Sequence, residues 1–551
     1  MSDAVLYFHH DAYDTGGARL MGRHSAGESF LRGYLRHARA ETLHLWNVAN
    51  GPIEAAEALV RRIEPIRKPL IWHRSRRHLP DVGVLNMPVP GLPQEAWARR
   101  PLGEQAYAIC GVTHTTATEV VMRTMSDLLL SPLHDYDALI CTSEAVRASI
   151  ETQLDGVREF LAQEYGPRRR PEPMRVTIPL GVNAEDFRTT PADRKAWRDR
   201  LDIPEDAIVA LYVGRFSANG KMNPALMALA LEQAARRTGR PLYWVNSGWA
   251  GSEKGEAFHH ENTRALCPSV RYRHVDGRAA DVRFSIWSVA DLFISFSDNI
   301  QETFGLTPVE AMAAGLPCVV TDWDGYRDTV RNGEDGFRIA TYAPPPGAGG
   351  DLAYAFADNP GIDYNHYIGA ASQFTALDLG AAAQAIVDLA ENPDLRASMG
   401  ARAQARARSI FDWSAIIPQY EALWAEQNAR RRAAPVVALR ATGNPFRPDP
   451  FALFGGYPTR HLRPGWRVAT PPGLTWEAAH ALLTSPLASH SGFGRPPIAE
   501  VRQVFEWLST HGPASVAEAM EVIPPARRPF VERGLLWMAR FNTLVLTPDG
   551  L

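Results

Sequence analysis

The sequence predicts an α/β fold with two doubly wound parallel sheets in tandem, followed by a smaller, mainly helical module. Three observations lead to this prediction. Short β-branched or apolar runs alternate with helical stretches over about the first 180 residues, and a second alternating series follows a charged, turn-rich junction at Ala184–Pro204. From Arg495 onward, apolar residues recur at helical spacing. Alternation of apolar runs with helical stretches is typical of parallel strands joined by crossover helices.

We expect each apolar run to form one buried parallel strand, because crossover helices cover both faces of such a sheet. In the first series the runs are Val5–Phe8, Thr42–Trp46, Leu70–Trp72, Tyr107–Val112, Ala138–Cys141 and Val176–Pro179. In the second series they are Ile208–Val213, Leu242–Val245, Val270–Tyr272, Leu292–Ser295 and Pro317–Thr321. A loop rich in proline and glycine, Ala343–Pro360, interrupts the second series, and the helical stretch Trp413–Arg432 closes it.

These patterns divide the chain into five parts. The predicted parts are an N-terminal domain at 1–185, a second domain at 186–412, a closing helix at 413–432, a linker arm at 433–494 and a C-terminal module at 495–551. In the linker arm, prolines and glycines separate isolated aromatic residues, which favours an extended segment packed on another surface. The C-terminal module is predicted to have three helices and a strand, an order that resembles a winged helix. These elements are Ile498–Leu508, Ser515–Val522, Pro529–Ala539 and Thr543–Thr547.

Composition and charge exclude several classes of protein. The 551 residues are 45% hydrophobic and 22% charged, which excludes collagenous, coiled-coil and wholly disordered chains. The formal net charge is −3, so no field of the whole chain attracts nucleic acid or anionic lipid. The four cysteines are isolated in apolar stretches, and neither a secretory signal nor an apolar run of membrane-spanning length is apparent. We therefore expect reduced thiols and a cytoplasmic protein.

The strongest functional signal starts at Glu302, where a second carboxylate, Glu310, follows eight residues later. Thr307 is suited to cap a helix, Pro308 to its first turn and Gly315 to its end. A helix that starts after a strand and a glycine loop offers unpaired backbone N–H groups to a diphosphate. A capping box, in which Glu310 bonds back to the Thr307 amide, fits the same residues.

A second element favours the diphosphate interpretation. The predicted strand that ends at Gly214 is followed by two cations, Arg215 and Lys221, on a short loop. Ligands of open α/β sheets bind at the carboxyl ends of strands, and fixed Arg and Lys donors stabilise the charge that develops on a diphosphate leaving group. When Arg215 or Lys221 is taken alone, the alternative interpretation is a solvated cation on a loop.

These residues resemble the retaining GT-B glycosyltransferases of family 4. The resemblance covers about residues 1–430, and four motifs occur in the family's order. They are Leu180-Gly181-Val182-Asn183, Gly214-Arg215 with Lys221, the Glu302 and Glu310 pair, and Asn332-Gly333-Glu334-Asp335-Gly336-Phe337. The resemblance implies a GT-B fold, in which two Rossmann-like domains face each other across a cleft. It also implies transfer of a sugar from a nucleotide diphosphate sugar with retention of configuration.

By this resemblance, Arg215 and Lys221 would hold the diphosphate. Glu302 would bind hydroxyls of the donor sugar, and Glu310 those of the ribose. The loop between the two cations is one residue longer than the family's commoner spacing, and Gly220 can absorb the extra residue. Cations and a helix dipole would replace a metal, so neither a metal nor a cofactor is expected. The donor base would be read near Arg273, His274 and Val275.

The remaining implied roles concern the phosphates and the transferred sugar. Gly17, in a glycine-bearing loop that continues through Gly22–Phe30, would face the cleft near the donor, and His114 would orient the transferred sugar. The backbone amides that would cradle the phosphates are those of Phe304, Gly305, Leu306 and Thr307. The implied catalytic residues are Glu302, His114, Arg215 and Lys221. The pair Asp322 and Asp324 is interpreted as part of a connecting loop and not as a metal site.

The charge of the C-terminal module bears on its partner. Between Arg495 and Leu551 there are six basic and six acidic residues. Because phosphate neutralisation needs an excess of cations, nucleic acid is not expected, and protein binding, acceptor docking or dimerisation is favoured.

Two functional classes stay open. The first is a metal-independent hexosyltransferase that uses a UDP- or GDP-linked sugar as co-substrate and a hydroxyl acceptor on a glycan, a lipid-linked glycan or a protein. The second is a regulatory protein that senses a nucleotide sugar and engages a partner through the C-terminal module. The intact set of charged residues favours the enzyme.

Overall fold

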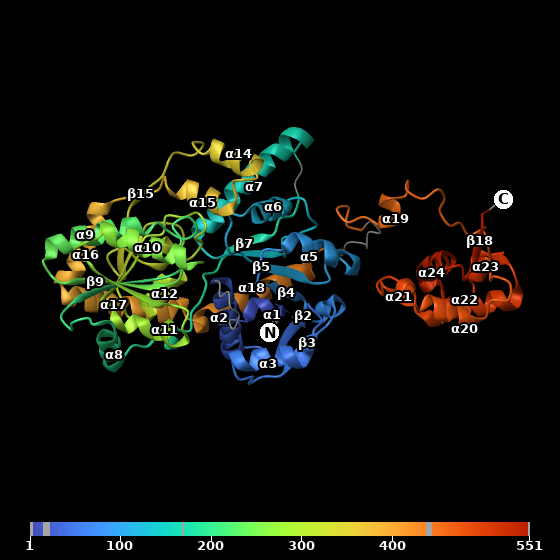
Figure 1. The fold of residues 1–551 in the computed structure, drawn as a ribbon, viewed down its shortest axis with the longest axis horizontal. Helices are drawn as coiled ribbons and strands as arrows, with labels where there is room; N and C mark the ends of the chain where they lie inside the picture. The colour runs from blue at the N-terminus through green and yellow to red at the C-terminus, as the bar shows by residue number, and fades with distance from the viewer. Residues whose placement is uncertain (1–3, 15–21, 168–169, 437–442, 549–551) are drawn as a thin grey trace. The chain divides into compact units, whose positions relative to one another are not determined.

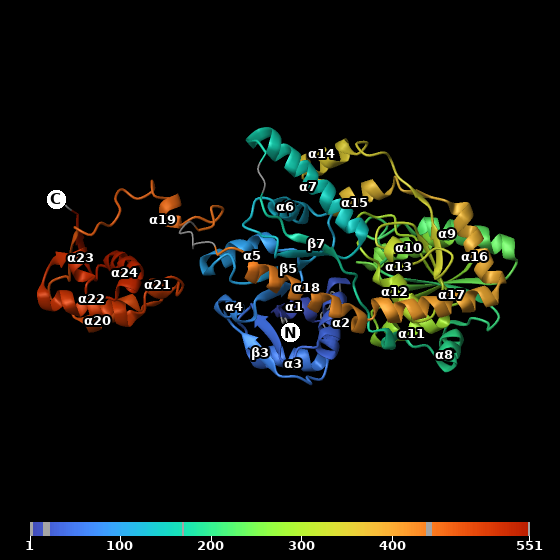
Figure 2. The same cartoon turned by 180° about the vertical axis from the view of Figure 1, so that it is seen from behind.

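A computed structural model describes residues 4–14, 22–167, 170–436 and 443–548. The chain divides into two units, Met1–Asn444 and Pro445–Leu551, and each has its own core. Figures 1 and 2 show the helices and strands of both units from opposite sides.

The first sheet of the larger unit has seven parallel strands in the order β3-β2-β1-β4-β5-β6-β7. The strands are β1 Val5–Phe8, β2 Leu43–Asn47, β3 Leu70–His73, β4 Val84–Met87, β5 Ala108–Val112, β6 Ala138–Cys141 and β7 Met174–Thr177. The helices are α1 His10–Tyr13, α2 Gly22–His37, α3 Ile53–Ile63, α4 Leu79–Val82, α5 Leu92–Arg99, α6 Glu119–Asp127 and α7 Glu144–Tyr165. Strand β4 is absent from the predicted set, because the polar Asn86 interrupts its short apolar run.

The second sheet has six parallel strands in the order β10-β9-β8-β11-β12-β13. The strands are β8 Ile208–Val213, β9 Leu242–Gly248, β10 Arg271–Asp276, β11 Leu292–Ser295, β12 Cys318–Thr321 and β13 Gly336–Ile339. The helices are α8 Pro191–Leu201, α9 Pro224–Thr238, α10 Glu253–Leu266, α11 Ala280–Ser285, α12 Leu306–Ala313, α13 Tyr326–Thr329, α16 Leu379–Glu391 and α17 Pro393–Arg406. The edge strand β13 was not predicted, because its middle residues are half-buried and include Arg338.

Helices cover both faces of each sheet (Figure 1). Successive side chains of a strand point to opposite faces, so alternate residues enter different cores. In β8, Ile208 and Ala210 pack with α9 and α16, whereas Val209 and Leu211 pack with α8 and α12. In the first domain, α2, α3 and α18 (Trp413–Ala433) cover one face, and α5, α6 and α7 cover the other. The predicted fold class is confirmed: two Rossmann-like α/β domains and a mainly helical C-terminal module.

Helix α18 follows the second domain in sequence but belongs to the core of the first. Its first residue, Trp413, is buried in the core of the first domain. Further along the helix, Nε2 of Gln427 donates 3.0 Å hydrogen bonds to the backbone oxygens of Ile109 and Tyr136. Buried apolar side chains of α18 complete the packing against α2.

The segment predicted as a loop at Ala343–Pro360 contains a helix. Helix α14 spans Gly350–Asp358 and is followed by α15 at Tyr364–Ser372. The two helices pack through a ring stack of Phe356 on Tyr367, with centroids 4.4 Å apart. A short two-stranded sheet, β14 Thr341–Tyr342 and β15 Ala376–Leu377, closes the insertion at its base.

The C-terminal unit is built around a three-stranded antiparallel sheet in the order β17-β16-β18. Its elements are α19 Pro450–Leu453, β16 Arg467–Ala469, α20 Trp476–Leu483, α21 Pro486–Ser489, α22 Ile498–His511, β17 Ala514–Ser515, α23 Val516–Ala519, α24 Arg528–Arg540 and β18 Val545–Thr547. The segment expected to be a linker arm supplies β16, α20 and α21. Trp466, Val468 and Leu483 are buried in the core of the unit, so these isolated apolar residues anchor secondary structure. Among the described residues of the whole chain, no helix combines the length and apolar character needed to cross a bilayer.

Candidate functional site

Helix α12 begins directly after Gly305, whose backbone is left-handed with φ +86°. A Cβ at this position would lie 2.1 Å from Cε1 of Tyr326, so only glycine fits. The Tyr326 ring is held by a 2.8 Å hydrogen bond between its hydroxyl group and Oγ of Ser295. The turn therefore presents the first backbone N–H groups of α12, which lack helical partners, at the positive end of the helix dipole.

The capping arrangement predicted for Thr307 does not form. Helix α12 starts at Leu306, so Thr307 lies inside the first turn, and the N-cap Gly305 has no side chain to cap with. The alternative interpretation of Glu310 as part of a capping box with Thr307 is therefore wrong. Gly315, predicted to end the helix, follows the C-cap residue with φ +83°.

Lys221 and Glu302 form an ion pair, although 81 residues separate them in the sequence. They follow β8 and β11, which are neighbours in the sheet, so their loops meet at its carboxyl edge. The loop that carries Lys221 is tied to the other loop, because Nε2 of Gln301 donates a 2.9 Å hydrogen bond to the backbone oxygen of Gly220. The pair is thus fixed from both loops.

Glu302 is held as a carboxylate. Burial alone would raise its pKa, but the Lys221 ammonium and two backbone N–H groups outweigh this effect, and the pKa lies below its usual value. The side chain is also partly accessible, with 11% of its surface exposed. An ionised carboxylate at this position can accept hydrogen bonds from ligand hydroxyl groups.

Arg215 lies on the exposed side of the loop after β8. Its backbone oxygen accepts a 3.2 Å hydrogen bond from the Tyr212 hydroxyl. Within the described parts of the chain, the guanidinium of Arg215 forms no ion pair with a carboxylate, so its charge is available to a ligand. Burial raises the pKa of Tyr212, the charge of Glu302 raises it further, and the charge of Arg215 opposes this.

Three further carboxyl groups at this edge hold their protons more tightly than usual. Burial raises the pKa of Glu310 to about 7, against the opposing charges of Arg283 and Lys221. Burial also raises the pKa of Asp298 to about 7 and that of Asp324 to about 8. These groups therefore change charge near neutral pH.

The first domain contacts the Glu302 loop through the N-terminus of α7. Oγ1 of Thr142 donates a 3.4 Å hydrogen bond to the backbone oxygen of Thr303. The backbone N–H of Glu144 donates a 2.7 Å hydrogen bond to Oδ2 of Asp328. Both domains thus contribute to the surroundings of the Lys221–Glu302 pair.

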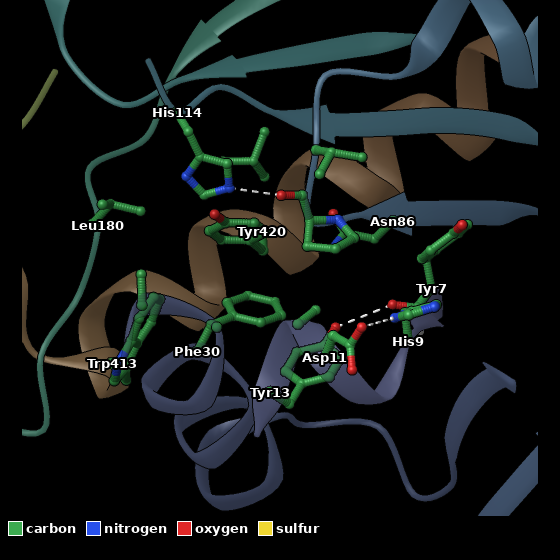
Figure 3. Close-up of a pocket in the computed structure, with 16 residues that line it drawn as sticks. Tyr7, His9, Asp11, Tyr13, Phe30, Asn86, His114, Leu180, Trp413 and Tyr420 are labelled. Carbon is green, nitrogen blue, oxygen red and sulfur yellow. Dashed lines mark hydrogen bonds and ion pairs between the residues drawn. The ribbon is translucent and has the colours of Figure 1, made fainter. Parts of the chain in front are cut away.

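A cavity of about 300 Å³ lies beside His114 in the first domain, partly walled by α18 (Figure 3). Its lining is Tyr7, His9, Asp11, Ala12, Tyr13, Ala26, Gly27, Phe30, Asn86, Pro88, Val89, Val112, His114, Leu180, Trp413 and Tyr420. Most of these side chains are apolar or aromatic. Nε2 of His114 lies 2.7 Å from the backbone oxygen of Pro88, which fixes the ring. Oδ1 of Asn86 is buried without a hydrogen-bond partner, so it can accept a hydrogen bond from a ligand.

The structure brings some of the predicted residues together and separates others. Lys221, Glu302 and the start of α12 form one cluster, whereas His114 lines the cavity of the first domain, whose lining includes no member of that cluster. Gly17 lies outside the described residues. The predicted loop Gly22–Phe30 is the beginning of α2 instead. Within this helix, Gly27 packs closely on α1, since a Cβ would lie 2.2 Å from the backbone oxygen of Ala12.

The sequence interpretation missed residues that position the site. Nδ2 of Asn299 donates a 2.6 Å hydrogen bond to the backbone oxygen of Asn219, which adds a second tie to the one made by Gln301. Tyr326 packs behind Gly305, and the buried carboxyl group of Asp298 borders the same loop. A run of polar residues directly after β11 was the available signal, because polar side chains at the carboxyl end of a buried strand face the ligand edge.

The fold and the site define an α/β protein with a cation–carboxylate pair and a helix N-terminus at the carboxyl edge of its second sheet. Residues 193–345 match the sequence profile of the family described as glycosyl transferases group 1. The second domain therefore carries a glycosyl transferases group 1 segment.

Relatives of known activity match over part of their length. The chain is 30% identical over 311 residues to D-inositol 3-phosphate glycosyltransferase of Streptomyces scabiei, covering 53% of this chain and 58% of the relative. It is 29% identical over 205 residues to lipopolysaccharide 1,2-N-acetylglucosaminetransferase of Salmonella typhimurium, covering 36% of this chain and 52% of the relative. The chain thus spans about half the length of these relatives.

Among solved structures, the chain is similar to Anabaena Alr3699/HepE in complex with UDP, with a TM-score of 0.49 and 16% identity. The match covers 77% of this chain and 100% of the other. Sucrose-phosphate synthase from Thermosynechococcus elongatus is similar with a TM-score of 0.46 and 17% identity, over 78% of this chain and 100% of that one.

Proposed function

We propose that the protein is a retaining, metal-independent glycosyltransferase that moves a hexose from a UDP- or GDP-linked sugar to a hydroxyl acceptor and uses no cofactor. The observation that carries this proposal is the Lys221–Glu302 ion pair at the start of α12, with the unpaired Arg215 on the same loop. The glycosyl transferases group 1 profile over residues 193–345 supports it independently.

In the proposed reaction, the bond between C1 of the sugar and the diphosphate oxygen breaks while the acceptor oxygen bonds to C1 on the same face. The proton of the acceptor hydroxyl passes to an oxygen of the leaving phosphate. Arg215, Lys221 and the amides of Gly305, Leu306 and Thr307 stabilise the charge that develops on this phosphate, whereas the Phe304 N–H bonds to Glu302. Glu302 orients the sugar through its hydroxyl groups, and His114 orients it from the first domain.

Binding of UDP-glucose is expected to strengthen as the pH rises from about 6 to about 8, by up to tenfold. The proposed role of Glu310 is to accept hydrogen bonds from the ribose hydroxyls, and only the carboxylate, which forms above a pKa of about 7, accepts with both oxygens. Calorimetry of wild type and Glu310→Gln across this range measures the effect. The variant should lose most of the pH dependence, and an equal slope in both proteins would exclude this role of Glu310.

The same raised pKa of Glu310 has a consequence for the unliganded protein. The folded state holds this proton more tightly than the unfolded state, so Glu310 contributes stability at low pH that is lost as the pH rises through about 7. Because the proposed ribose contact needs the Glu310 carboxylate, donor binding is expected to lower the pKa of Glu310. Ionisation of Glu310 is in turn expected to strengthen donor binding.

The acceptor is proposed to occupy the cavity beside His114. Because its walls are aromatic and apolar, with Asn86 as a polar contact, a hydroxylated aromatic or otherwise apolar acceptor fits better than a free sugar. Val89→Trp, which fills the cavity, is expected to raise the KM for an aromatic alcohol such as 4-methylumbelliferone about tenfold. Val120→Trp, at an exposed position outside the cavity, is the matched control. Equal KM values in the two variants would place the acceptor elsewhere.

The experiment that tests the proposed function is a screen of UDP- and GDP-linked sugars by thermal shift, followed by product analysis with those that bind. A donor that binds only the folded state raises the unfolding temperature with its concentration. Binding with product of retained anomeric configuration supports the enzyme. Tight binding without turnover supports the regulatory alternative, and no binding by any nucleotide sugar would refute both.

For the C-terminal unit we propose a winged-helix-like module that binds a protein partner or the acceptor carrier, or that mediates dimerisation. Of its two adjacent arginines, Arg527 is already paired with Glu500, at 2.8 Å and 2.9 Å. This ion pair reduces the cationic surface that a nucleic acid would need.

A further inference from the structure

A cluster of imidazole and carboxylate groups joins α10 to β10, away from the Lys221–Glu302 pair. Glu256 and His260 lie one helical turn apart on α10, and His274 lies on β10. One potential ligand atom from each residue lies within 4.8 Å of the other two. In the described part of the chain, this is the only group of three His, Cys, Asp or Glu side chains that come so close.

The separations of the ligand atoms are close to those of a metal site. Oε1 of Glu256 lies 3.9 Å from Nε2 of His260 and 3.7 Å from Nε2 of His274. Zinc bonds of 2.0–2.1 Å in a tetrahedral arrangement place neighbouring ligand atoms about 3.3 Å apart. The two separations from Glu256 are therefore close to this value, and the nitrogens of His260 and His274 lie within 4.8 Å of each other.

Hydrogen bonds around the cluster already orient two of the three ligands. Nδ1 of His260 lies 2.6 Å from the Tyr272 hydroxyl, which leaves Nε2 of this ring to face Glu256 and His274. Oε2 of Glu256 accepts a 3.3 Å hydrogen bond from the backbone N–H of Ala250, which leaves Oε1 for the cluster. Such second contacts fix the ring and carboxylate orientation in metal sites.

The surroundings of His260 favour a role as a metal ligand over a role as a buried core residue alone. Its Nε2 is buried without a hydrogen-bond partner, an arrangement that costs free energy unless something binds there. The adjacent His259 also has an unpartnered Nε2, but it is not a member of the cluster with Glu256 and His274.

We propose that Glu256, His260 and His274 bind one Zn²⁺ ion, with water as the fourth ligand. Two imidazole nitrogens and one carboxylate oxygen suit zinc, whereas magnesium and calcium prefer oxygen ligands alone. Side-chain exposures of 27%, 12% and 23% leave the cluster partly accessible to solvent. On binding, Nε2 of His274 would exchange its long 3.3 Å contact with the backbone oxygen of Gly248 for the metal.

The ion would stiffen the strand edge next to the proposed donor site. The Phe216 ring packs edge-on against the rings of His260 and His274, with centroids 5.2 Å and 5.5 Å away. Phe216 directly follows Arg215, so a metal that fixes the two imidazoles also fixes the anchor of this arginine. His274 also belongs to the segment expected to read the donor base, whereas no residue proposed to contact the donor phosphates or sugar is a ligand, so the role of the ion is structural and not catalytic.

The test is zinc binding by the full-length, tag-free protein after treatment with a chelator and dialysis. Calorimetry is expected to show one Zn²⁺ per chain, and the unfolding temperature should rise with zinc concentration. Cobalt in place of zinc should give the intense visible absorption of a four-coordinate site. His260→Ala and Glu256→Gln are each expected to weaken binding by at least a hundredfold. None of these measurements depends on sugar transfer, so they stand whether or not the proposed function holds.

A matched control is His366→Ala. His366 lies 2.9 Å from Asp363 at the protein surface, and among the described residues no third ligand joins them, so its loss should leave zinc binding unchanged. No saturable zinc uptake by the wild-type protein would overturn the proposal, as would binding that persists equally in His260→Ala and Glu256→Gln. Circular dichroism of the two variants separates loss of a ligand from loss of the fold.

Discussion

Replacement of Lys221 by Met is expected to lower kcat/KM for sugar transfer by about 10²–10³-fold. The ammonium group is proposed to stabilise the phosphate charge in the transition state, and Met preserves the length of the side chain without the charge. The change also leaves the carboxylate of Glu302 without its cation in a buried position, so the pKa of Glu302 should rise. Both effects are expected to act on the chemical step, because the pair is proposed to contact phosphate and sugar.

Steady-state kinetics with a nucleotide sugar, together with a pH profile, measure this effect. Lys195→Met is the control, since Lys195 forms a 2.6 Å surface ion pair with Asp199 outside the site. The acidic limb of the profile should move to higher pH in Lys221→Met and stay in place in the control. Wild-type kcat/KM in Lys221→Met would refute the role of this residue, whereas loss of turnover in both variants would indicate a general loss of structure.

Replacement of Gly305 by Ala is expected to lower the free energy of unfolding by about 2–4 kcal/mol and to abolish donor binding. A left-handed residue other than glycine costs about 1 kcal/mol by itself. The added Cβ would also overlap the Tyr326 ring, with contacts of 2.1 Å and 2.4 Å. That ring cannot move away freely, because its hydroxyl group is bonded to Ser295.

The variant Gly333→Ala separates the cost of the left-handed backbone from the cost of the overlap with Tyr326. Gly333 is also left-handed, with φ +77°, but nothing lies within 4 Å of the position of its Cβ. Its variant should lose only about 1 kcal/mol and retain donor binding. Denaturant unfolding and calorimetry with a nucleotide sugar measure both quantities. Equal destabilisation of the two variants would show that overlap with Tyr326 does not matter.

Local sequence signals predict most of the strands, because a buried parallel strand requires a run of apolar residues. They fail at β4 and β13, where Asn86 and Arg338 occupy positions that an apolar rule excludes. They fail again at β16 and α20. Trp466 and Val468 are isolated among prolines in the sequence, and their burial depends on pairing with β17 and β18, which are distant in the chain. Rules based on sequence patterns use residues that are close in the chain, so they do not detect contacts between residues that are distant in the sequence.

The candidate site shows the same division. The sequence identifies Arg215, Lys221, Glu302 and Glu310 by their places after predicted strands, which are local properties. It could not decide between a cap and an anion site at Thr307, because that choice depends on where α12 starts, and Tyr326 sets the start by admitting only glycine at position 305.

The sequence by itself therefore determined two α/β domains, a helical C-terminal module and the charged residues at the strand ends. The tertiary structure alone decided that Lys221 pairs with Glu302, that His114 lines an apolar cavity, and that His260 and His274 meet Glu256. The physical reason is the order of the strands. β8 lies between β9 and β11 in the sheet, and this lateral order brings loops together that the chain keeps far apart.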